Sequence, residues 1–415
     1  MYALGSNRSV IRELFEFGKK LAAKEGSDKV YDFSLGNPSV PAPATVKGSI
    51  EKQINLPNST ALHGYSSAQG DPDVRKAIAD HIEKYFGAKA DPNLIYLTVG
   101  AAAALCVSLK ALKEEGDNFV CFAPFFPEYS VFTAATGATL RVVTMQEDCK
   151  MDLVSAAKII DKNTKGIIIN SPNNPSGAVY SEEEIKSLCC LLESKSNEYG
   201  HPIFIISDEP YREIVYDGIV VPYLMNYYKD VVVCYSYSKS LSLPGERIGY
   251  IAINPQATEA QDLYYAVCGA GRALGYVCAP HLFQRILLDC VDAPADVEAY
   301  DKNRKLLYSS LTEIGYECVK PQGAFYLMVK SPERDANAFS ERAKKFGLLI
   351  VPGDTFGAPG FVRISYCVSY DNQGDSPHIA VDRIKNGIQR FHENPPVGMV
   401  ILFCIEKIKI FILNA

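Results

Sequence analysis

Short apolar runs alternate with longer helical stretches through the middle of the chain, and this alternation restricts the fold more than any other feature. Each run is rich in β-branched or other apolar residues and is about as long as one strand. The runs are NFVCFA (118–123), ATLRVV (138–143), KGIIIN (165–170), PIFIIS (202–207), DVVVCY (230–235) and RIGYIAIN (247–254). Apolar strands separated by helices are typical of a mainly parallel sheet that helices cover on both faces. The sequence therefore predicts an α/β fold with such a sheet at its centre.

Composition limits the size and the partners of this fold. A chain of 415 residues, 47% of them apolar and 22% charged, can bury a large core and is long enough for two domains. The net charge of -6 comes from interspersed acidic and basic residues, without a Lys/Arg-rich run. We therefore expect no nucleic-acid partner.

The cysteines, the histidines and the N-terminal residues bear on location and metal binding. The 12 cysteines include no CxxC pair, and their one adjacent pair, Cys189 and Cys190, lacks metal-ligand spacing. The 6 histidines form no HExxH motif, so we expect no metal site. Residues 1–20 lack an apolar core followed by a small-residue cleavage site. These features predict a cytoplasmic protein with reduced thiols and no membrane partner.

Three polar residues of catalytic type follow three successive apolar runs. Asn174, Asp208 and Lys239 come after the third, fourth and fifth runs, respectively. They are separated by about 30 residues, the length of one βαβ unit. In an open parallel sheet a ligand binds beyond the carboxyl ends of the strands, so we expect these side chains to converge on one site.

Lysine, aspartate and asparagine together suit one cofactor. A lysine amine forms a Schiff base with an aldehyde, an aspartate keeps a pyridinium nitrogen protonated, and an asparagine amide donates to a phenolate oxygen. This set describes a pyridoxal 5′-phosphate site. The stretch TVGAAAAL (98–105) offers a cradle for the phosphate, because its glycine permits close backbone approach at the start of a helix. Ser236, Ser238 and Arg247 would complete that cradle.

A larger set of motifs, in a fixed order, resembles a known family. The motifs are SLGNPS (34–39), GYSSAQG (64–70), TVGAA (98–102), APFFPEY (123–129), NSPNNPSG (170–177), DEPY (208–211), SYSK (236–239), GERIG (245–249), PQGAFY (321–326) and VRIS (362–365). Each motif alone is weak, but the ordered set is specific. The chain resembles the class I/II pyridoxal phosphate-dependent aminotransferases of fold type I, from about residue 5 to about residue 393. The resemblance implies a large domain with a mainly parallel sheet and a smaller α+β domain.

The resemblance implies a role for each residue around the cofactor ring. Lys239 would form the Schiff base and then act as general base and acid in the proton shift. Asp208 would pair with the pyridine nitrogen, and Asn174 and Tyr211 would donate to the ring hydroxylate. Phe126 would stack on the ring. From the residues alone other roles stay open: a helix N-cap for Asp208, a turn residue for Asn174 and a core aromatic for Phe126.

Two further groups of residues are implied to bind anions. Arg363 would grip the substrate α-carboxylate as a bidentate fork, assisted by the Gly36 backbone and the Asn174 amide. A surface ion pair is the alternative for Arg363. Tyr65 would reach the cofactor phosphate from the other subunit of a homodimer. The remaining phosphate ligands would be Gly100, Ala101, Ala102, Ser236, Ser238 and Arg247.

The substrate side chain is less constrained. Some aspartate-using members of the family bind the side-chain carboxylate of the substrate, the distal carboxylate, with a basic residue. This chain has Ala102 at that position. Other members use an arginine from the partner subunit, and Arg272 in AGRALGYVCAP lies in the corresponding region. If Arg272 enters the neighbouring site, dicarboxylic amino acids such as aspartate and glutamate are favoured. If it is a surface or interface charge, neutral or aromatic amino acids fit equally well.

The resemblance also suggests domain boundaries. Residues 1–45 would form an N-terminal arm joining the small domain, residues 46–280 the large cofactor-binding domain, and residues 281–393 the small C-terminal domain. Residues 394–415 form an apolar extension beyond the usual end of the family, and the sequence leaves open whether it adds a strand or a helix or lies outside the fold. Its uncharged run, 394–405, is too short to span a bilayer.

The expected reaction is ping-pong transamination between an L-amino acid and a 2-oxo acid, by a homodimer with two shared sites. Nearly the same residues serve β-eliminating carbon-sulfur lyases, which would release pyruvate and ammonia without a 2-oxo acid acceptor. A non-catalytic cofactor-binding regulatory module is a third class. It is disfavoured because no helix-turn-helix head fits in the few residues before the fold.

Overall fold

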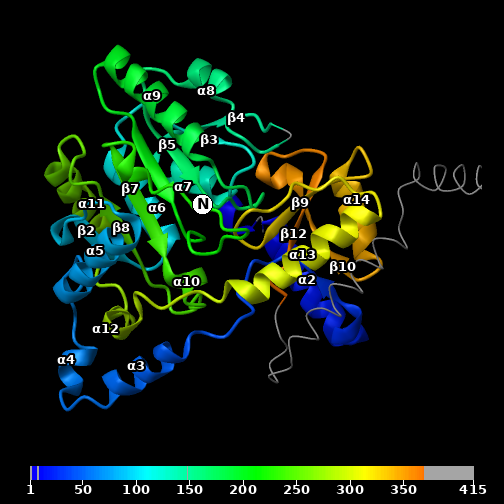
Figure 1. Ribbon diagram of the computed structural model, residues 1–415, viewed down its shortest axis with the longest axis horizontal. Helices are drawn as coiled ribbons and strands as arrows, with labels where there is room; N and C mark the ends of the chain where they lie inside the picture. Colours follow the sequence, from blue (N-terminus) through cyan, green and yellow to red (C-terminus); the bar gives the residue numbers. More distant parts are fainter. Residues whose placement is uncertain (1, 7–8, 147, 369–415) are drawn as a thin grey trace, which may run out of the picture. The chain divides into compact units, whose positions relative to one another are not determined.

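The computed structural model describes residues 2–6, 9–146 and 148–368 (Figure 1). The chain divides into two compact units. The large unit comprises residues 38–297 and 322–324. The small unit comprises the described parts of residues 1–37, 298–321 and 325–415.

A seven-stranded sheet forms the centre of the large unit, in the order β2-β8-β7-β6-β5-β3-β4 (Figure 1). Its strands are β2 (Ile95–Thr98), β3 (Asn118–Phe122), β4 (Thr139–Val143), β5 (Thr164–Asn170), β6 (Phe204–Asp208), β7 (Val231–Ser236) and β8 (Gly249–Ile253). Neighbouring strands run parallel except at β8, which is antiparallel to both β2 and β7. Each apolar run contributes one of the strands from β3 to β8. The prediction of an α/β fold with a mainly parallel sheet is confirmed.

Apart from its edge strand β4, the sheet is buried on both faces, because its other strands are apolar almost throughout. In β7, Val231, Val233 and Tyr235 belong to one core cluster, whereas Val232 and Cys234 belong to another. This alternation follows from the period of two that sends successive strand side chains to opposite faces. The first cluster includes residues of α3 (Ala44–Ile54), α5 (Pro72–Phe86), α8 (Leu153–Ile159), α9 (Glu182–Tyr199) and α12 (His281–Cys290). The second cluster includes residues of α6 (Ala101–Leu112), α7 (Glu128–Thr136) and α11 (Ala260–Leu274).

Local sequence signals set the ends of these helices, as α9 illustrates. The Ser181 hydroxyl accepts from Glu184 N at 3.2 Å, and the Glu184 carboxylate accepts from Ser181 N at 2.9 Å, which is a capping box. Gly200 ends the helix in the left-handed conformation, with φ 74°. The shorter helices of the large unit are α4 (Ser59–His63), α10 (Tyr237–Ser240) and the 3-10 turns η2 (Pro92–Leu94) and η3 (Leu224–Asn226).

The small unit contains an antiparallel sheet in the order β11-β12-β9 and a parallel pair of β1 with β10. The N-terminal segment belongs to this unit because Tyr31 N donates to Gly347 O, and Ser365 N to Phe33 O, each at 2.8 Å. Its strands are β1 (Tyr31–Asp32), β9 (Tyr326–Lys330), β10 (Leu348–Leu349), β11 (Val351–Pro352) and β12 (Phe361–Ser365). Its helices are α1 (Tyr2–Ser6), α2 (Val10–Glu25), η1 (Ser27–Lys29), α13 (Val297–Glu313), α14 (Ala336–Lys344) and η4 (Gly353–Phe356).

The compact units divide at residues 37/38 and 297/298, whereas the boundaries suggested by sequence are 45/46 and 280/281. Helix α12 stays with the large unit because it packs against α3 and α5. Asp289 of α12 accepts from Ser49 Oγ at 2.7 Å and pairs with Lys52 Nζ at 2.8 Å.

Two expectations concern membranes and the C-terminal extension. The extension at 394–415 lies outside the described residues. Within the part of the chain that the structure describes, no helix combines the length and the apolar character needed to cross a bilayer.

A substitution at Gly249 tests how tightly the antiparallel strand is packed. A Cβ atom there would lie 2.3 Å from Tyr235 O and 3.0 Å from Gly100 Cα. Gly249→Ala should therefore lower the free energy of unfolding by about 1–3 kcal/mol in urea titrations, because β8 must shift away. The matched control is Gly269→Ala on α11, where a Cβ atom meets nothing within 4 Å. It should raise stability by about 0.5–1 kcal/mol, and equal stability of the two variants would contradict this packing.

Candidate active site

The carboxyl ends of β5 and β6 are joined by a buried asparagine. Asn170, the last residue of β5, donates from Nδ2 to Asp208 O at 2.8 Å, and its Oδ1 accepts from Asn174 N at 2.7 Å. Asn170 and Asp208 also face each other in strand register. The segment that carries Asn174 is thereby fixed beside the end of β6. Our sequence reasoning missed Asn170, although its position at the end of an apolar run is a signal of the kind that marks Asp208.

The Asp208 side chain is buried at the end of β6. Its Oδ2 accepts a hydrogen bond from Tyr129 Oη at 2.5 Å, while its Oδ1 has no hydrogen-bond partner among the described residues. Burial raises the pKa of Asp208 to about 7; the bond from Tyr129 opposes this rise, and the nearby Glu209 charge adds to it. Burial and the adjacent Asp208 charge raise the pKa of Tyr129 well above its usual value, so Tyr129 remains a donor.

Sequence reasoning also missed Tyr129. It lies on α7, which follows β3, so no strand-end spacing relates it to Asp208. The tyrosine of the quoted motif APFFPEY was the available signal.

Lys239 lies on α10, directly after β7. Its Nζ is 5.9 Å from the centroid of the Tyr211 ring, and its side chain is half-buried. Ser236 caps the short helix by accepting from Ser238 N at 3.2 Å. On the other side of the lysine, the Ser240 hydroxyl lies 2.9 Å from Tyr235 Oη, so the residues on both sides of Lys239 are held in place. The structure also brings Lys239 and Tyr211 together.

The backbone geometry at Gly100 and the uncapped start of α6 suit the binding of an anion. Gly100 precedes α6 with φ 85°, a conformation that side chains rarely adopt, and no side chain caps this helix. Ala101 and Ala102 form its first turn, whose N–H groups favour negative charge. A Cβ atom on Gly100 would lie 2.8 Å from Arg247 Nη2, so the guanidinium can lie this close only because residue 100 has no side chain.

Two serines and Arg247 lie near this helix start, because Ser236 faces Gly249 in strand register and a Cβ atom on Gly249 would lie 3.0 Å from Gly100 Cα. Ser236 Oγ and Ser238 Oγ are 2.7 Å apart at the end of β7. Arg247 Nη2 donates to Val99 O at 3.3 Å, next to Gly100. The helix start, two hydroxyls and one guanidinium together form a group suited to a phosphate.

Phe126 lies at the wall of the site beside Tyr129. The two rings meet edge to face, with centroids 5.7 Å apart and an interplanar angle of 85°. Tyr129 donates to Asp208, so the half-buried Phe126 contacts a residue that itself contacts the Asp208 carboxylate.

Gly36 and Arg363 belong to the small unit, where both contact Tyr326. Arg363 is 2% exposed, and its guanidinium lies 4.7 Å from the centroid of the Tyr326 ring and 4.8 Å from that of Phe356. Its Nη2 donates to Ser34 O. A Cβ atom on Gly36 would collide with Tyr326 Oη. Arg363 is thus an interior arginine of this unit, not a member of a surface ion pair.

Tyr65 and Arg272 lie on the surface of the large unit. Tyr65, in the loop after α4, is 97% exposed, and Arg272 is exposed in the last turn of α11. In a single chain both side chains are accessible to a second molecule.

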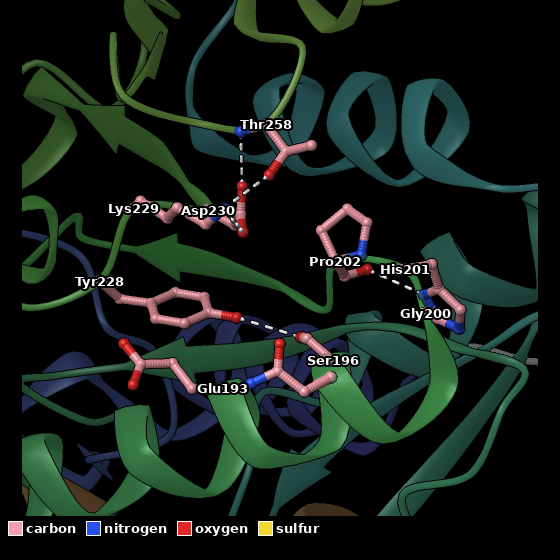
Figure 2. Close-up of a pocket in the computed structure, with 10 residues that line it drawn as sticks. Glu193, Ser196, Gly200, His201, Pro202, Tyr228, Lys229, Asp230 and Thr258 are labelled. Carbon is pink, nitrogen blue, oxygen red and sulfur yellow. Dashed lines mark hydrogen bonds and ion pairs between the residues drawn. The ribbon is translucent and has the colours of Figure 1, made fainter.

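A polar cleft of about 490 Å³ lies at the other edge of the sheet, near the amino ends of β6 and β7 (Figure 2). Its polar groups bond one another. Asp230 Oδ1 accepts from Thr258 N at 2.6 Å, and the Tyr228 and Ser196 hydroxyls are 3.5 Å apart. None of the residues from the predicted site lines it. The candidate active site is therefore the edge formed by the carboxyl ends of β5, β6 and β7.

Comparison with known proteins identifies the family of the chain. Residues 28–374 match the family model of aminotransferases class I and II. The crystal structure of an amino transferase from Eubacterium rectale has a TM-score of 0.90 and 54% identity, and the match covers 95% of this chain and 96% of that one. The aspartate aminotransferase of Pyrococcus abyssi is 28% identical over 393 residues, covering 91% of this chain and 95% of its own length. The aromatic-amino-acid aminotransferase 2 of Thermococcus litoralis is 27% identical, with the same two coverages, 91% and 95%.

These matches extend over both units. The predictions of family, enzyme class and cofactor made from the ordered motifs are confirmed. The chain belongs to the class I and II aminotransferases, a family whose cofactor is pyridoxal 5′-phosphate.

Proposed function

We propose that this aminotransferase moves an amino group between an L-amino acid and a 2-oxo acid in two half-reactions at the edge formed by β5, β6 and β7. The observation that carries the proposal is Asp208 Oδ1, a buried carboxylate oxygen to which no described residue donates a hydrogen bond. Buried polar atoms are almost always paired, so this oxygen suits a donor that a bound group brings. The protonated ring nitrogen of pyridoxal phosphate is such a donor.

The other polar groups of the large unit fit the remainder of the cofactor. Asn174 and Tyr211 would donate to its ring oxygen, and Phe126 would cover one face of its ring. When bound, the cofactor supplies an electron-withdrawing ring that stabilises negative charge at the substrate Cα. The group that would hold its phosphate consists of Gly100, Ala101, Ala102, Ser236, Ser238 and Arg247.

Asp208 and Lys239 are the residues to which we assign the chemistry. A cation opposite Asp208 favours its carboxylate form, which then holds the proton on the ring nitrogen. Lys239 Nζ removes the proton from the Cα of the amino acid and supplies one in the reverse half-reaction. Tyr211, whose ring centroid lies 5.9 Å from Nζ, limits where the lysine side chain can move.

Arg363 is proposed to bind the substrate α-carboxylate, with the Gly36 backbone assisting. A guanidinium buried between two aromatic rings has lost part of its hydration and gains from a bidentate carboxylate. For the distal group, Ala102 supplies no charge, which leaves Arg272. We propose aspartate or glutamate as an amino donor, read by Arg272 of a second copy.

The proposal includes a homodimer. Tyr65 is proposed to reach the phosphate of a cofactor held by the other subunit. The large unit exposes several sizeable apolar side chains that a second copy would cover. They are Tyr65, Tyr265, Leu274 and Val277.

Removal of the lysine tests the chemical assignment. Lys239→Ala should lower turnover with every amino donor by about 10³-fold or more, because the proton at Cα loses its base. Turnover is measured as 2-oxo acid formed from the donor in the presence of an acceptor. The control is Lys229→Ala, at a lysine that is 61% exposed at the opposite edge of the sheet. Full turnover in Lys239→Ala would refute the assignment. Release of pyruvate and ammonia by the wild-type protein, without a 2-oxo acid acceptor, would indicate β-elimination instead of transamination.

Asp208→Asn should affect stability and cofactor binding in opposite directions. Because burial raises the pKa of Asp208 from 3.8 to about 7, wild-type protein without cofactor loses stability as pH rises through this range. An uncharged asparagine avoids that loss. The cofactor-free variant should exceed wild type by on the order of 4 kcal/mol at pH 8 and by little at pH 4, in denaturant titrations.

The same variant should bind pyridoxal phosphate more weakly than wild type, since the partner of its ring nitrogen is no longer anionic. The control Asp262→Asn, at an exposed carboxylate, should change stability by less than about 0.5 kcal/mol at either pH. A stability difference independent of pH would argue against a buried charge at Asp208.

Arg272→Ala tests the substrate side chain. If Arg272 reads a distal carboxylate, kcat/KM for aspartate should fall about 30-fold, which corresponds to roughly 2 kcal/mol of lost charge pairing. Alanine, which lacks that carboxylate, serves as the internal control and should be used as before. An equal loss with both donors would assign Arg272 to the interface, not to the substrate.

A further inference from the structure

The loop that carries Tyr65 has a fixed backbone under an exposed side chain. Tyr65 is 97% exposed, so contacts of its own ring do not position it within the chain. The loop itself is closed by backbone bonds: Gly64 N donates to Thr60 O at 2.9 Å and Gly70 N to Ser67 O at 2.9 Å. Whatever places Tyr65 must act through this backbone.

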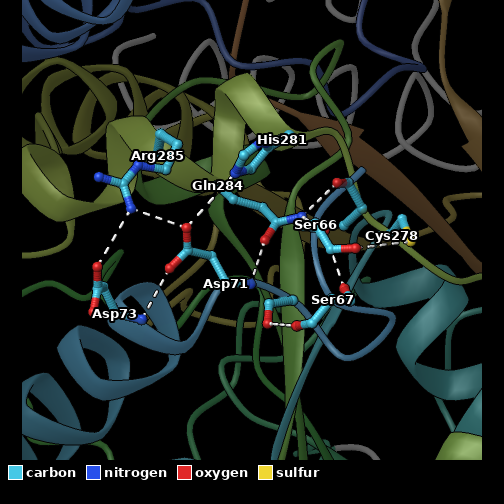
Figure 3. Close-up of polar contacts among 10 residues, drawn as sticks. Ser66, Ser67, Asp71, Asp73, Cys278, His281, Gln284 and Arg285 are labelled. Carbon is cyan, nitrogen blue, oxygen red and sulfur yellow. Dashed lines mark hydrogen bonds and ion pairs between the residues drawn. The ribbon is translucent and has the colours of Figure 1, made fainter. Parts of the chain in front are cut away.

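Gln284 of α12 lies at the base of the loop (Figure 3). Its side chain is 0% exposed, and both its amide oxygen and its amide nitrogen form hydrogen bonds there. Its Oε1 accepts from Asp71 N at 2.8 Å, and its Nε2 donates to Ser66 Oγ at 3.1 Å and to Ala279 O at 2.5 Å. One buried amide thus joins both ends of the segment 66–71 to the start of α12.

The neighbours of Gln284 strengthen the same connection. Cys278 N donates to Ala68 O at 3.2 Å. Arg285 Nη1 donates to Asp71 Oδ2 at 2.9 Å (Figure 3). The loop is therefore bonded along its length to residues 278–285. Because the loop is already ordered before its tip binds a partner, binding costs less conformational entropy.

The segment that binds the loop is continuous with the end of α11. Gly275 N donates to Arg272 O at 3.2 Å, and Tyr276 N donates to Gly271 O at 2.8 Å. Tyr96 Oη, from the neighbouring strand β2, donates to Tyr276 O at 2.7 Å. The backbone is fixed from Arg272 to the contacts of Gln284.

We propose that Gln284 is a positioning residue for Tyr65: it holds the loop so that the tyrosine hydroxyl meets the cofactor phosphate of the other subunit. This inference rests on the role of Tyr65 in the proposed function. Gln284 itself is buried beneath the loop and acts through Ser66 and Asp71.

A double-mutant cycle on cofactor binding tests this coupling. The dissociation constant of pyridoxal 5′-phosphate is measured by titrating cofactor-free protein, so the readout does not require turnover. Tyr65→Phe should weaken binding by about tenfold, the effect of one hydrogen bond to a charged group. Gln284→Met, which keeps the size of the side chain and removes its polar atoms, should weaken binding by about threefold to tenfold. In the Tyr65→Phe background, Gln284→Met should have no further effect.

Two variants control for a general loss of structure. Ser66→Ala removes only the hydroxyl that accepts from Gln284 Nε2 at 3.1 Å, and serves if Gln284→Met fails to fold. Asn254→Leu removes a buried amide that donates to Tyr228 O at 3.1 Å, at the opposite edge of the sheet. Asn254→Leu should lower the melting temperature and leave the dissociation constant within about twofold of wild type.

The outcomes separate this inference from the proposed function. If Gln284→Met weakens binding equally with and without the Tyr65 hydroxyl, or not at all, Gln284 does not position Tyr65. If Tyr65→Phe itself leaves binding unchanged, the proposed role of Tyr65 fails, and the inference fails with it. Non-additive loss in the cycle supports both.

Discussion

Burial of the central sheet on both faces is the constraint on which the rest of the structure depends. The side chains of each strand enter apolar clusters on both faces of the sheet. Polar side chains can therefore be accommodated only at the strand ends. Asn170 and Asp208 occupy two such ends, and the Asn170 amide bonds the Asp208 carbonyl at 2.8 Å. Because β5, β6 and β7 run parallel, their carboxyl ends meet at one edge, where the chain then places Lys239. The site is thus a consequence of how the sheet is covered.

Within that edge the charges are arranged asymmetrically. The Glu209 carboxylate, next to Asp208, forms a buried ion pair with Arg212, whose other nitrogens donate to Val221 O and Pro222 O at 3.1 Å. Among the described residues no cation pairs with Asp208; its Oδ2 accepts from the Tyr129 hydroxyl, and its Oδ1 accepts from none of them. A buried carboxylate in this state costs stability, as its raised pKa indicates. A bound cation opposite Asp208 would remove that cost.

The residues that we assign to substrate and cofactor differ in how they are supported. Arg363 lies between aromatic rings inside the small unit. The residues that we assign to the cofactor phosphate offer backbone N–H groups and side chains at strand and helix ends. Tyr65, by contrast, is exposed, and its position depends on the buried Gln284 amide below its loop. If Tyr65 serves a second subunit, as we propose, burial in its own chain cannot position it, and a fixed backbone does so instead.

The sequence by itself determined the α/β class, the parallel strands and the residues at their ends, because apolar periodicity and strand-end polarity are local signals. With the ordered motifs it also determined the family and the cofactor. Only the tertiary structure decided that Tyr129 donates to Asp208, that Gln284 joins residues 66 and 71, and that α12 packs with the large unit. Tyr129 and Asp208 are 79 residues apart in the sequence, and Gln284 is 218 residues from Ser66 and 213 residues from Asp71. Contacts at such separations are set by the packing of whole helices on the sheet, and no local pattern encodes them.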